Sequence, residues 1–295
     1  METVSLYVVV SYSSNERMFS ESMLRSLDSM CSLVGSLSFG RQHARAIISI
    51  GSRLYTGDPE DEGHILGLRH KFNRIEFVRY NVNCLDDPIA LHNAARIKGV
   101  EHATTLQTHK NCGRRAPGGD SGFWVLFLDG DELMEADAFA EWFVSKEGRF
   151  DLVSKLANYW YFMHPTLVSK VFEDSVLLAH SSTLTPKALT HPRERDGIVS
   201  CAGRNGPRNV LGINGRPMFH HYSWVRSDEK ELLRKVSNWG HKNDKPWDNL
   251  IRMYTQDIKE RGIWPQRDFV HGYELVRIPE DKVRFQDLLF QGSQN

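Results

Sequence analysis

The clearest structural signal lies in residues 123–132, where an apolar run meets a group of acids: Phe123-Trp124-Val125-Leu126-Phe127-Leu128-Asp129-Gly130-Asp131-Glu132. The six apolar residues predict a strand that is buried on both faces. Acids that follow such a strand lie at the rim of a parallel sheet, where open α/β folds bind ligands. Carboxylate oxygens suit a hard divalent cation. The stretch therefore predicts a metal site or, because Asp-Gly pairs commonly mark turns, a solvated turn.

Strands and helices alternate before this stretch. Apolar, β-branched runs predict strands at residues 4–10, 46–50 and 75–78. A three-to-four-residue apolar spacing predicts a helix over residues 19–34, and Asp87-Pro88 predicts a second helix that runs to about Gly99. This order favours an α/β fold with a parallel sheet and right-handed crossovers. The polar segment from Thr104 to Gly122 is predicted to be a long mobile loop.

The character of the chain changes after about residue 150. A helix is predicted near residues 137–146, with Gly148 at its end. Beyond it come an aromatic run at residues 158–162 and a basic, loop-like segment from Thr185 to Gly215. Ser227 is expected to cap a last helix, whose apolar positions reach Trp239 before Gly240 ends it.

Composition limits the class of protein. The chain has 295 residues, and its 37 lysines and arginines balance 37 aspartates and glutamates, which argues against a general nucleic-acid binder. Four well-separated cysteines form no CxxC pair, so we expect reduced thiols and no zinc site. No basic region precedes the first apolar run, and no apolar stretch approaches the roughly 18 residues that span a bilayer. We expect a soluble, cytoplasmic protein with no signal peptide and no transmembrane segment.

These pieces together resemble a family 2 glycosyltransferase of the GT-A type. Residues 4–12 resemble the first strand of that family, and residues 91–99 resemble its Ala-Arg-Asn helix. Asp129-Gly130-Asp131 matches its Asp-X-Asp signature, and residues 218–224 resemble the late histidine segment of related sugar transferases. The resemblance covers roughly residues 3–240. It implies one continuous GT-A-like domain with a mostly parallel central sheet flanked by helices. Its Rossmann-like, nucleotide-sugar-binding half spans residues 1–150, and an acceptor-binding half with a C-terminal helical region spans residues 151–295.

The chain departs from the family after its second strand. An acidic cluster is usual there, but this sequence has Gly51-Ser52-Arg53, so Asp58, Asp86 and Asp87 are alternative base contacts. The Asn and Arg of the helix motif also stand in reversed order. The residues that the resemblance implies as donor contacts are Ser11, Tyr12, Asn15, Gly51, Arg53, Asn93, Arg96, Asp129 and Gly130.

The resemblance also implies a metal at the acidic motif. We expect Asp131 to bind the metal and Asp129 to bind the ribose or the metal, with His220 or His221 as a further ligand. A divalent cation on the two phosphates would stabilise the leaving group, and an imidazole ligand favours Mn²⁺ over Mg²⁺. The alternative for the histidine pair is that one packs and the other faces solvent.

Glu173-Asp174 is the best candidate for a catalytic base, and we favour Asp174. An inverting transferase needs a carboxylate to take the proton of the acceptor hydroxyl. A retaining reaction needs no such base, and the pair could also be an exposed turn. The aromatic run at 158–162 is either a sugar platform or plain core. The charged run Arg193–Asp196, or Arg204 or Arg208, is either solvated or a clamp for the diphosphate.

Three functions follow from these features. The leading prediction is a metal-dependent glycosyltransferase that moves a sugar from a nucleoside-diphosphate sugar to a glycan, lipid or protein acceptor. A nucleotidyltransferase acting on sugar phosphates shares the sheet and the acidic rim, but its Gly-rich phosphate loop is missing between Ser11 and Arg17. The third possibility is a carbohydrate-binding protein whose transferase site has decayed.

Overall fold

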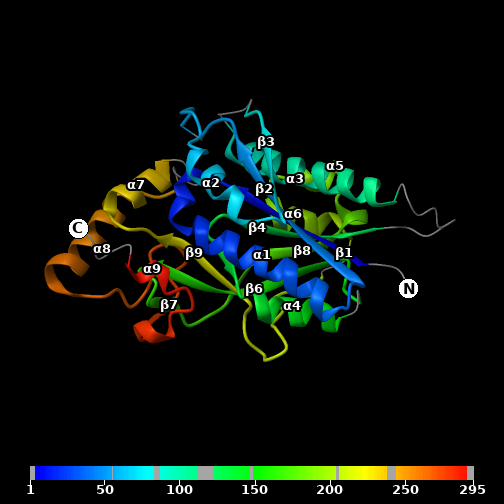
Figure 1. Cartoon of the computed structure of the whole chain (residues 1–295). Helices are drawn as coiled ribbons and strands as arrows, with labels where there is room; N and C mark the ends of the chain where they lie inside the picture. The colour runs from blue at the N-terminus through cyan, green and yellow to red at the C-terminus, as the bar shows by residue number, and fades with distance from the viewer. Residues whose placement is uncertain are drawn as a thin grey trace.

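The computed structural model describes residues 4–54, 56–82, 87–111, 122–146, 149–203, 206–237 and 244–290. Figure 1 shows the arrangement of the helices and strands. The strands are β1 Val4–Tyr12, β2 Gln42–Gly51, β3 Ile75–Tyr80, β4 Trp124–Asp129, β5 Glu132–Met134, β6 Val153–Met163, β7 Leu167–Ser169, β8 Glu173–His180, β9 Phe219–Val225 and β10 Leu275–Arg277. The α-helices are α1 Ser20–Leu37, α2 Gly63–Leu68, α3 Pro88–Asn111, α4 Ala136–Ser145, α5 Pro186–Leu189, α6 Glu194–Cys201, α7 Glu229–Ser237, α8 Trp247–Arg261 and α9 Asp287–Phe290. Short 3-10 helices cover Ser14–Phe19, Arg69–Lys71, Ser181–Thr183 and Glu280–Lys282.

The strands of the described residues form one mixed sheet in the order β10-β7-β6-β8-β4-β1-β2-β3, and β9 joins it through β6 and β5. The four strands β4, β1, β2 and β3 are parallel. The strand β8 runs antiparallel to both β4 and β6. The predicted α/β class with a helix-flanked sheet is confirmed, and β6 and β9 of the second half form a further parallel pair. Strands from both sides of residue 150 belong to the same sheet.

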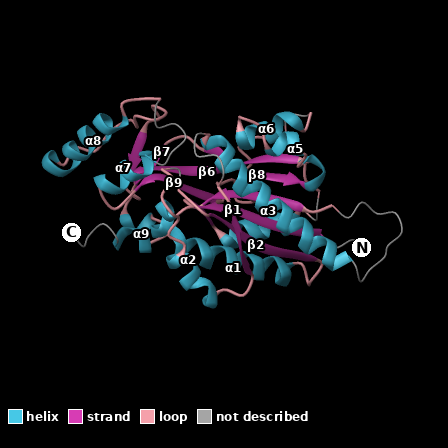
Figure 2. Cartoon of the chain, turned by 90° about the horizontal axis from the view of Figure 1, so that it is seen from above, coloured by secondary structure: helices cyan, strands magenta, loops and turns pink. Residues whose placement is uncertain are grey.

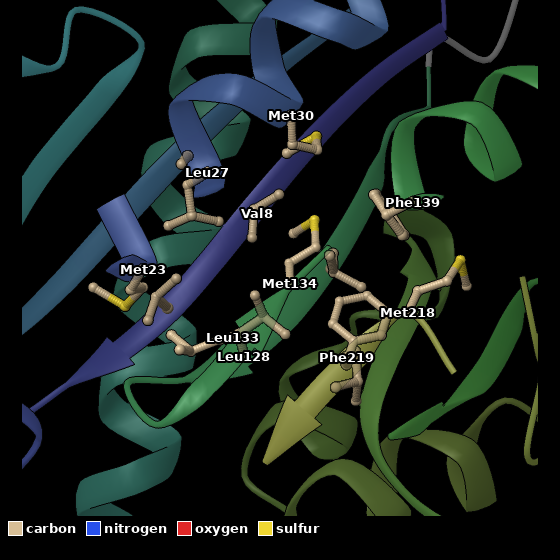
Figure 3. Packing of buried hydrophobic residues seen from close by; sticks show 14 of the residues in the cluster. Val8, Met23, Leu27, Met30, Leu128, Leu133, Met134, Phe139, Met218 and Phe219 are labelled. Atoms are coloured by element: carbon tan, nitrogen blue, oxygen red, sulfur yellow. The ribbon is translucent and has the colours of Figure 1, made fainter. Parts of the chain in front are cut away.

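Helices cover both faces of the parallel strands, since α1 packs on one face and α3 on the other. Figure 2 shows α5 and α6 beside β8 and β6. The strand β1 is buried on both faces because its side chains alternate between two layers. Val8 packs with Met23, Leu27 and Met30 of α1, as Figure 3 shows. Val9 belongs to the opposite layer, which includes residues of α3, α5 and α6. The predicted strand and the predicted helical spacing of α1 are therefore confirmed.

The helix α3 is longer than the sequence pattern predicted. It continues through Gly99 to Asn111, so the predicted loop is wrong for residues 104–111, and residues 112–121 lie outside the described part. Gly99 is required for packing and does not end the helix. A Cβ atom there would lie 2.3 Å from Cγ1 of Val9 on β1. The absence of a side chain lets α3 approach the sheet closely. At the start of the helix, Asp87 accepts hydrogen bonds from the backbone amides of Ile89 and Ala90, as predicted for a cap.

Two further predictions in the second half need correction. The segment from Thr185 to Gly215 contains the short helices α5 and α6. Thr185 caps α5, and the charged residues Glu194 and Arg195 of α6 form ion pairs inside the protein. The helix α7 is capped by Asp228, whose carboxylate accepts the backbone N–H of Glu231 at 2.9 Å. Ser227 was expected in that role. Gly148, Arg204, Trp239 and Gly240 lie outside the described residues.

A third apolar cluster closes the sheet at its β6–β9 end, where α7 and α8 pack. Its members include Trp160 of β6, Trp224 of β9 and Trp247 of α8. Cys31 and Cys201 are free thiols, and Cys84 and Cys112 lie outside the described residues. Within the described ranges, no helix has the length and apolar character that crossing a bilayer requires.

Candidate active site

A cavity of about 900 Å³ lies at the carboxyl ends of the parallel strands. Ser11, the penultimate residue of β1, lies beside Asp129 of β4, because the parallel register pairs these two residues. Both line the cavity. The cavity is also lined by the first residues of β8, Glu173 and Asp174, and by His221 of β9. Two pairs of acids that are more than forty positions apart in the sequence therefore face one cavity.

Asp129 belongs to a cluster of arginines and acids. Arg195 of α6 lies 2.9 Å from Asp129, and it also bonds both oxygens of the fully buried Glu132 at 2.7 and 3.1 Å. Arg96 of α3 lies 3.6 Å from Asp129 and 3.0 Å from Glu194. Burial alone would raise the pKa of Asp129, but Arg195 and then Arg96 outweigh it and hold the pKa below its usual value. We refer to Arg96, Asp129, Glu132, Glu194 and Arg195 as the arginine cluster.

Asp131 has different partners. The Lys235 ammonium of α7 lies 2.9 Å from Oδ2, and Arg226 lies 3.5 Å from the same oxygen. The other oxygen, Oδ1, lies 3.7 Å from Nε2 of His221. Burial acts to raise the pKa of Asp131, but Lys235 and His221 outweigh it and lower the pKa strongly. The two oxygens of Asp131 therefore both face basic groups, which favour its ionised form.

His221 connects Asp131 to the second acidic pair. Its Nδ1 lies 3.2 Å from Oε2 of Glu173, and Nε2 of His271 lies 3.2 Å from Oε1 of the same residue. Burial acts to lower the pKa of His221, but Glu173 and Asp131 outweigh it and raise the pKa above its usual value. We refer to Asp131, His221, Glu173 and His271 as the histidine–acid chain.

The neighbouring His220 points away from these acids. Successive side chains of a strand lie on opposite faces, so His220 cannot share the environment of His221. Its Nε2 lies 2.8 Å from Glu135 and its Nδ1 lies 2.9 Å from the Tyr161 hydroxyl. Burial lowers the pKa of His220. Of the two histidines expected as metal ligands, the structure brings only His221 to the acidic motif.

The acids of the second pair differ in their partners. Asp174 forms a two-point ion pair with Arg208, at 2.7 Å to Nε and 3.0 Å to Nη2. Glu173 contacts two imidazoles and no arginine among its ion pairs in the described residues. Both acids line the cavity, as expected for a catalytic pair. Their partners show that Asp174 has both oxygens engaged by one guanidinium group.

The expected donor contacts fall into two groups. Ser11, Tyr12, Asn15, Arg53, Asp129 and Gly130 line the cavity. Gly51, Asn93 and Arg96 do not. Gly51 lies close to Tyr80. A Cβ atom at position 51 would lie only 3.1 Å from the Tyr80 hydroxyl, so a side chain there would be crowded. Asn93 bonds the backbone oxygen of His191, and Arg96 is nearly fully buried in the arginine cluster.

The other candidate residues lie partly inside and partly outside the cavity lining. Glu60, which the sequence reasoning missed, lines the cavity and accepts the backbone N–H of Ser14 at 2.8 Å. Asp58 accepts a hydrogen bond from Thr56 outside the cavity lining, and Asp86 lies outside the described residues. In the aromatic run, Trp160, Tyr161 and Phe162 are core residues, although Trp160 also reaches the cavity wall.

Two residues that the sequence reasoning missed carry unusual electrostatics. Glu16 lies near Asp131, and burial followed by repulsion from Asp131 raises the pKa of Glu16 to about 7. Lys235 of α7 is buried against Asp131. The basic residues near the end of α7 were visible in the sequence, yet only the packing of α7 turns one of them inward.

The acidic motif can be tested against the predicted metal. Asp129, Asp131 and His221 are side chains of types that bind Mn²⁺. However, each carboxylate already contacts two cationic groups. In the part of the chain that the structure describes, no group of three or more His, Cys, Asp or Glu side chains is arranged to hold a metal ion. As arranged here, these residues do not fit a divalent cation.

The comparisons with known proteins give matches among solved structures alone. No family model matches the chain, and no curated protein matches it. Among solved structures, the fold is similar to a crystal structure of S. aureus TarS 1-349, with a TM-score of 0.43 and 11% sequence identity. The match covers 89% of this chain and 73% of that chain.

Proposed function

We propose that the chain is a GT-A glycosyltransferase that moves a sugar from a nucleoside-diphosphate sugar to a carbohydrate-bearing acceptor. One observation carries the proposal: the acids at the end of β4 and the acids at the start of β8 face the same cavity at the carboxyl ends of parallel strands. Such strand ends are where α/β sheets bind nucleotides. A volume of about 900 Å³ lies within the range of small-molecule sites and suits a donor together with part of an acceptor.

The charges of the cavity suit a diphosphate leaving group. Negative charge grows on the terminal phosphate as the bond to the sugar breaks, and fixed cationic groups stabilise it. Lys235 lines the cavity, and so does His221, whose raised pKa favours its protonated form. We assign the diphosphate to the part of the cavity beside Lys235 and His221. The nucleoside is assigned to the ends of β1 and β2, where Tyr12, Arg53 and Glu60 line the cavity.

We assign the role of base to Glu173. The acceptor hydroxyl must lose its proton as its oxygen attacks the anomeric carbon, with inversion at that carbon. The sequence favoured Asp174 for this role, but both oxygens of Asp174 pair with the guanidinium of Arg208, which is always charged and lowers the basicity of the carboxylate. The oxygens of Glu173 contact imidazoles, which can release a proton. The two imidazoles beside Glu173 orient its carboxylate within the cavity wall. Phe172, which is 43% exposed, and Tyr273 also line the cavity and offer apolar faces to a sugar ring.

The test is a donor-hydrolysis and transfer assay. A panel of nucleotide sugars is first screened for thermal stabilisation, because a ligand that binds only the folded state raises its melting temperature. The stabilising donor is then incubated with Mn²⁺ or with a chelator, with and without glycan acceptors, and products are identified. We expect release of the nucleoside diphosphate. The Asp131→Asn variant should lose this release, and the Asp58→Asn variant, whose carboxylate lies outside the cavity, should retain it.

Other outcomes would replace the proposal. Release of pyrophosphate would make the chain a nucleotidyltransferase. Binding of carbohydrate without any nucleotide product would make it a binding protein. The effect of the chelator tests the predicted Mn²⁺ dependence separately from the transfer reaction.

A further inference from the structure

The motif that was expected to bind a metal is occupied by an internal cation. Lys235 lies 2.9 Å from Oδ2 of Asp131, with 10% of the lysine side chain and 5% of the aspartate side chain exposed. The lysine is held there by the packing of α7, since Leu232 and Val236 on that helix belong to the apolar cluster with Trp224 and Trp247. The contact is therefore a built part of the fold.

The neighbours of Asp131 strengthen this arrangement. Arg226 approaches the same oxygen at 3.5 Å, and His221 approaches the other oxygen at 3.7 Å. A divalent cation needs direct contact with a carboxylate oxygen. It would then lie within a few ångströms of the Lys235 ammonium, where like charges repel in a poorly solvated site. The metal and the lysine therefore compete for one carboxylate.

We propose that Lys235 is a built-in counter-ion of Asp131 that competes with divalent cations, so that the resting protein binds Mn²⁺ weakly at this motif. Metal binding then requires Lys235 to leave Asp131. The competition between Lys235 and the metal does not depend on the proposed function. Only the role of the metal, which would be to bind the sugar donor, rests on that function. An anionic diphosphate in the same cavity would give Lys235 a second partner and would favour its departure.

The test measures Mn²⁺ binding alone, without any nucleotide. The full chain and the Lys235→Met variant are titrated with MnCl₂ by calorimetry, and free Mn²⁺ is followed by electron paramagnetic resonance. We expect the Lys235→Met variant to bind Mn²⁺ at least about tenfold more tightly, because a unit charge close to the carboxylate has been removed. The Lys235→Arg variant keeps the charge and should bind as weakly as the wild type.

Two controls assign the effect to Asp131. Lys155 is a second buried lysine that lines the cavity, but it contacts Asp196 at 3.3 Å. Lys155→Met should leave Mn²⁺ binding unchanged. Adding Asp131→Asn to Lys235→Met should abolish the gain.

If Lys235→Met does not fold, as judged by circular dichroism, Lys235→Gln replaces it with a side chain that keeps polar contacts.

Three results would overturn the proposal: equal Mn²⁺ affinity in the wild type and in Lys235→Met, no measurable binding to either, or the same gain in Lys155→Met. A gain in Mn²⁺ binding without any nucleoside diphosphate release in the hydrolysis assay would leave this inference standing and would reject the transferase instead. The two proposals can therefore fail separately.

Discussion

Asp129 and Asp131 are separated by one glycine, yet they belong to two different parts of the site. Asp129 lies in the arginine cluster, where Arg195 joins it to the fully buried Glu132. Asp131 lies in the histidine–acid chain, where His221 joins it to Glu173. The arginine cluster connects α3 and α6 to β4. The histidine–acid chain connects Asp131 to Glu173 of β8 through His221 of β9. Two aspartates that are almost adjacent in the sequence therefore belong to separate networks, one among arginines and one that reaches the acids of β8.

The largest effect is expected in the histidine–acid chain. Glu173→Gln removes the proposed base and should lower the turnover number by roughly 10²–10⁴-fold while the donor affinity changes little. Steady-state kinetics with the identified donor, together with calorimetric donor binding, measure both. Asp174→Asn is the matched variant, and we expect its loss of turnover to be smaller. The reverse order of the two losses would return the role of base to Asp174.

The next effect tests the arginine cluster through stability. Arg195→Met leaves Glu132 buried without its guanidinium partner, and losing one member of a buried ion pair costs about 3–5 kcal/mol in the free energy of unfolding. Urea denaturation monitored by circular dichroism measures this. Arg193→Met, at an exposed position two residues earlier, should change the free energy by no more than about 0.5 kcal/mol. A stable Arg195→Met protein would remove the structural role of the cluster.

Glu16, which lies near Asp131, is expected to make the stability of the protein depend on pH. Its carboxyl has a raised pKa of about 7, so the folded state holds this proton more tightly than the unfolded state does. The contribution of this group to stability is therefore present at low pH and is lost as the pH rises from about 4.5 to 7. The Glu16→Gln variant has no carboxyl group to ionise at this position, so it should not lose this part of the stability as the pH rises.

The measurement compares urea denaturation at pH 5 and pH 8. We expect the difference in unfolding free energy between pH 8 and pH 5 to rise in the Glu16→Gln variant by on the order of 1–3 kcal/mol relative to the wild type. An unchanged difference would mean that Glu16 is already ionised at pH 5 in the folded protein.

The smallest effect concerns the two histidines. His220→Gln should cost about 1–2 kcal/mol of stability, because it disturbs buried hydrogen bonds to Glu135 and Tyr161, and should leave turnover within about threefold. His221→Gln should instead lower turnover and change stability less. Thermal melts and kinetics of both variants measure the contrast. Equal losses of turnover would place both histidines in the catalytic machinery.

Much of the fold follows from local pattern. The β-branched run at the start of β1, the apolar run of β4 and the spacing of Met23, Leu27 and Met30 predicted elements that the structure contains. Hydrophobic periodicity is a local property, so it survives without knowledge of the neighbours. Gly99 shows where this approach fails, because its role in α3 depends on Val9, ninety positions earlier in the chain.

The sequence by itself determined which acids follow the central strand and which acids could act as a base. Only the tertiary structure decided their partners, because ion pairs such as Asp131–Lys235 and Asp129–Arg195 join residues more than sixty positions apart. Side-chain alternation in β9 then separated His220 from His221. The charge state of each acid depends on burial and on these distant cations, and neither is encoded in the local pattern.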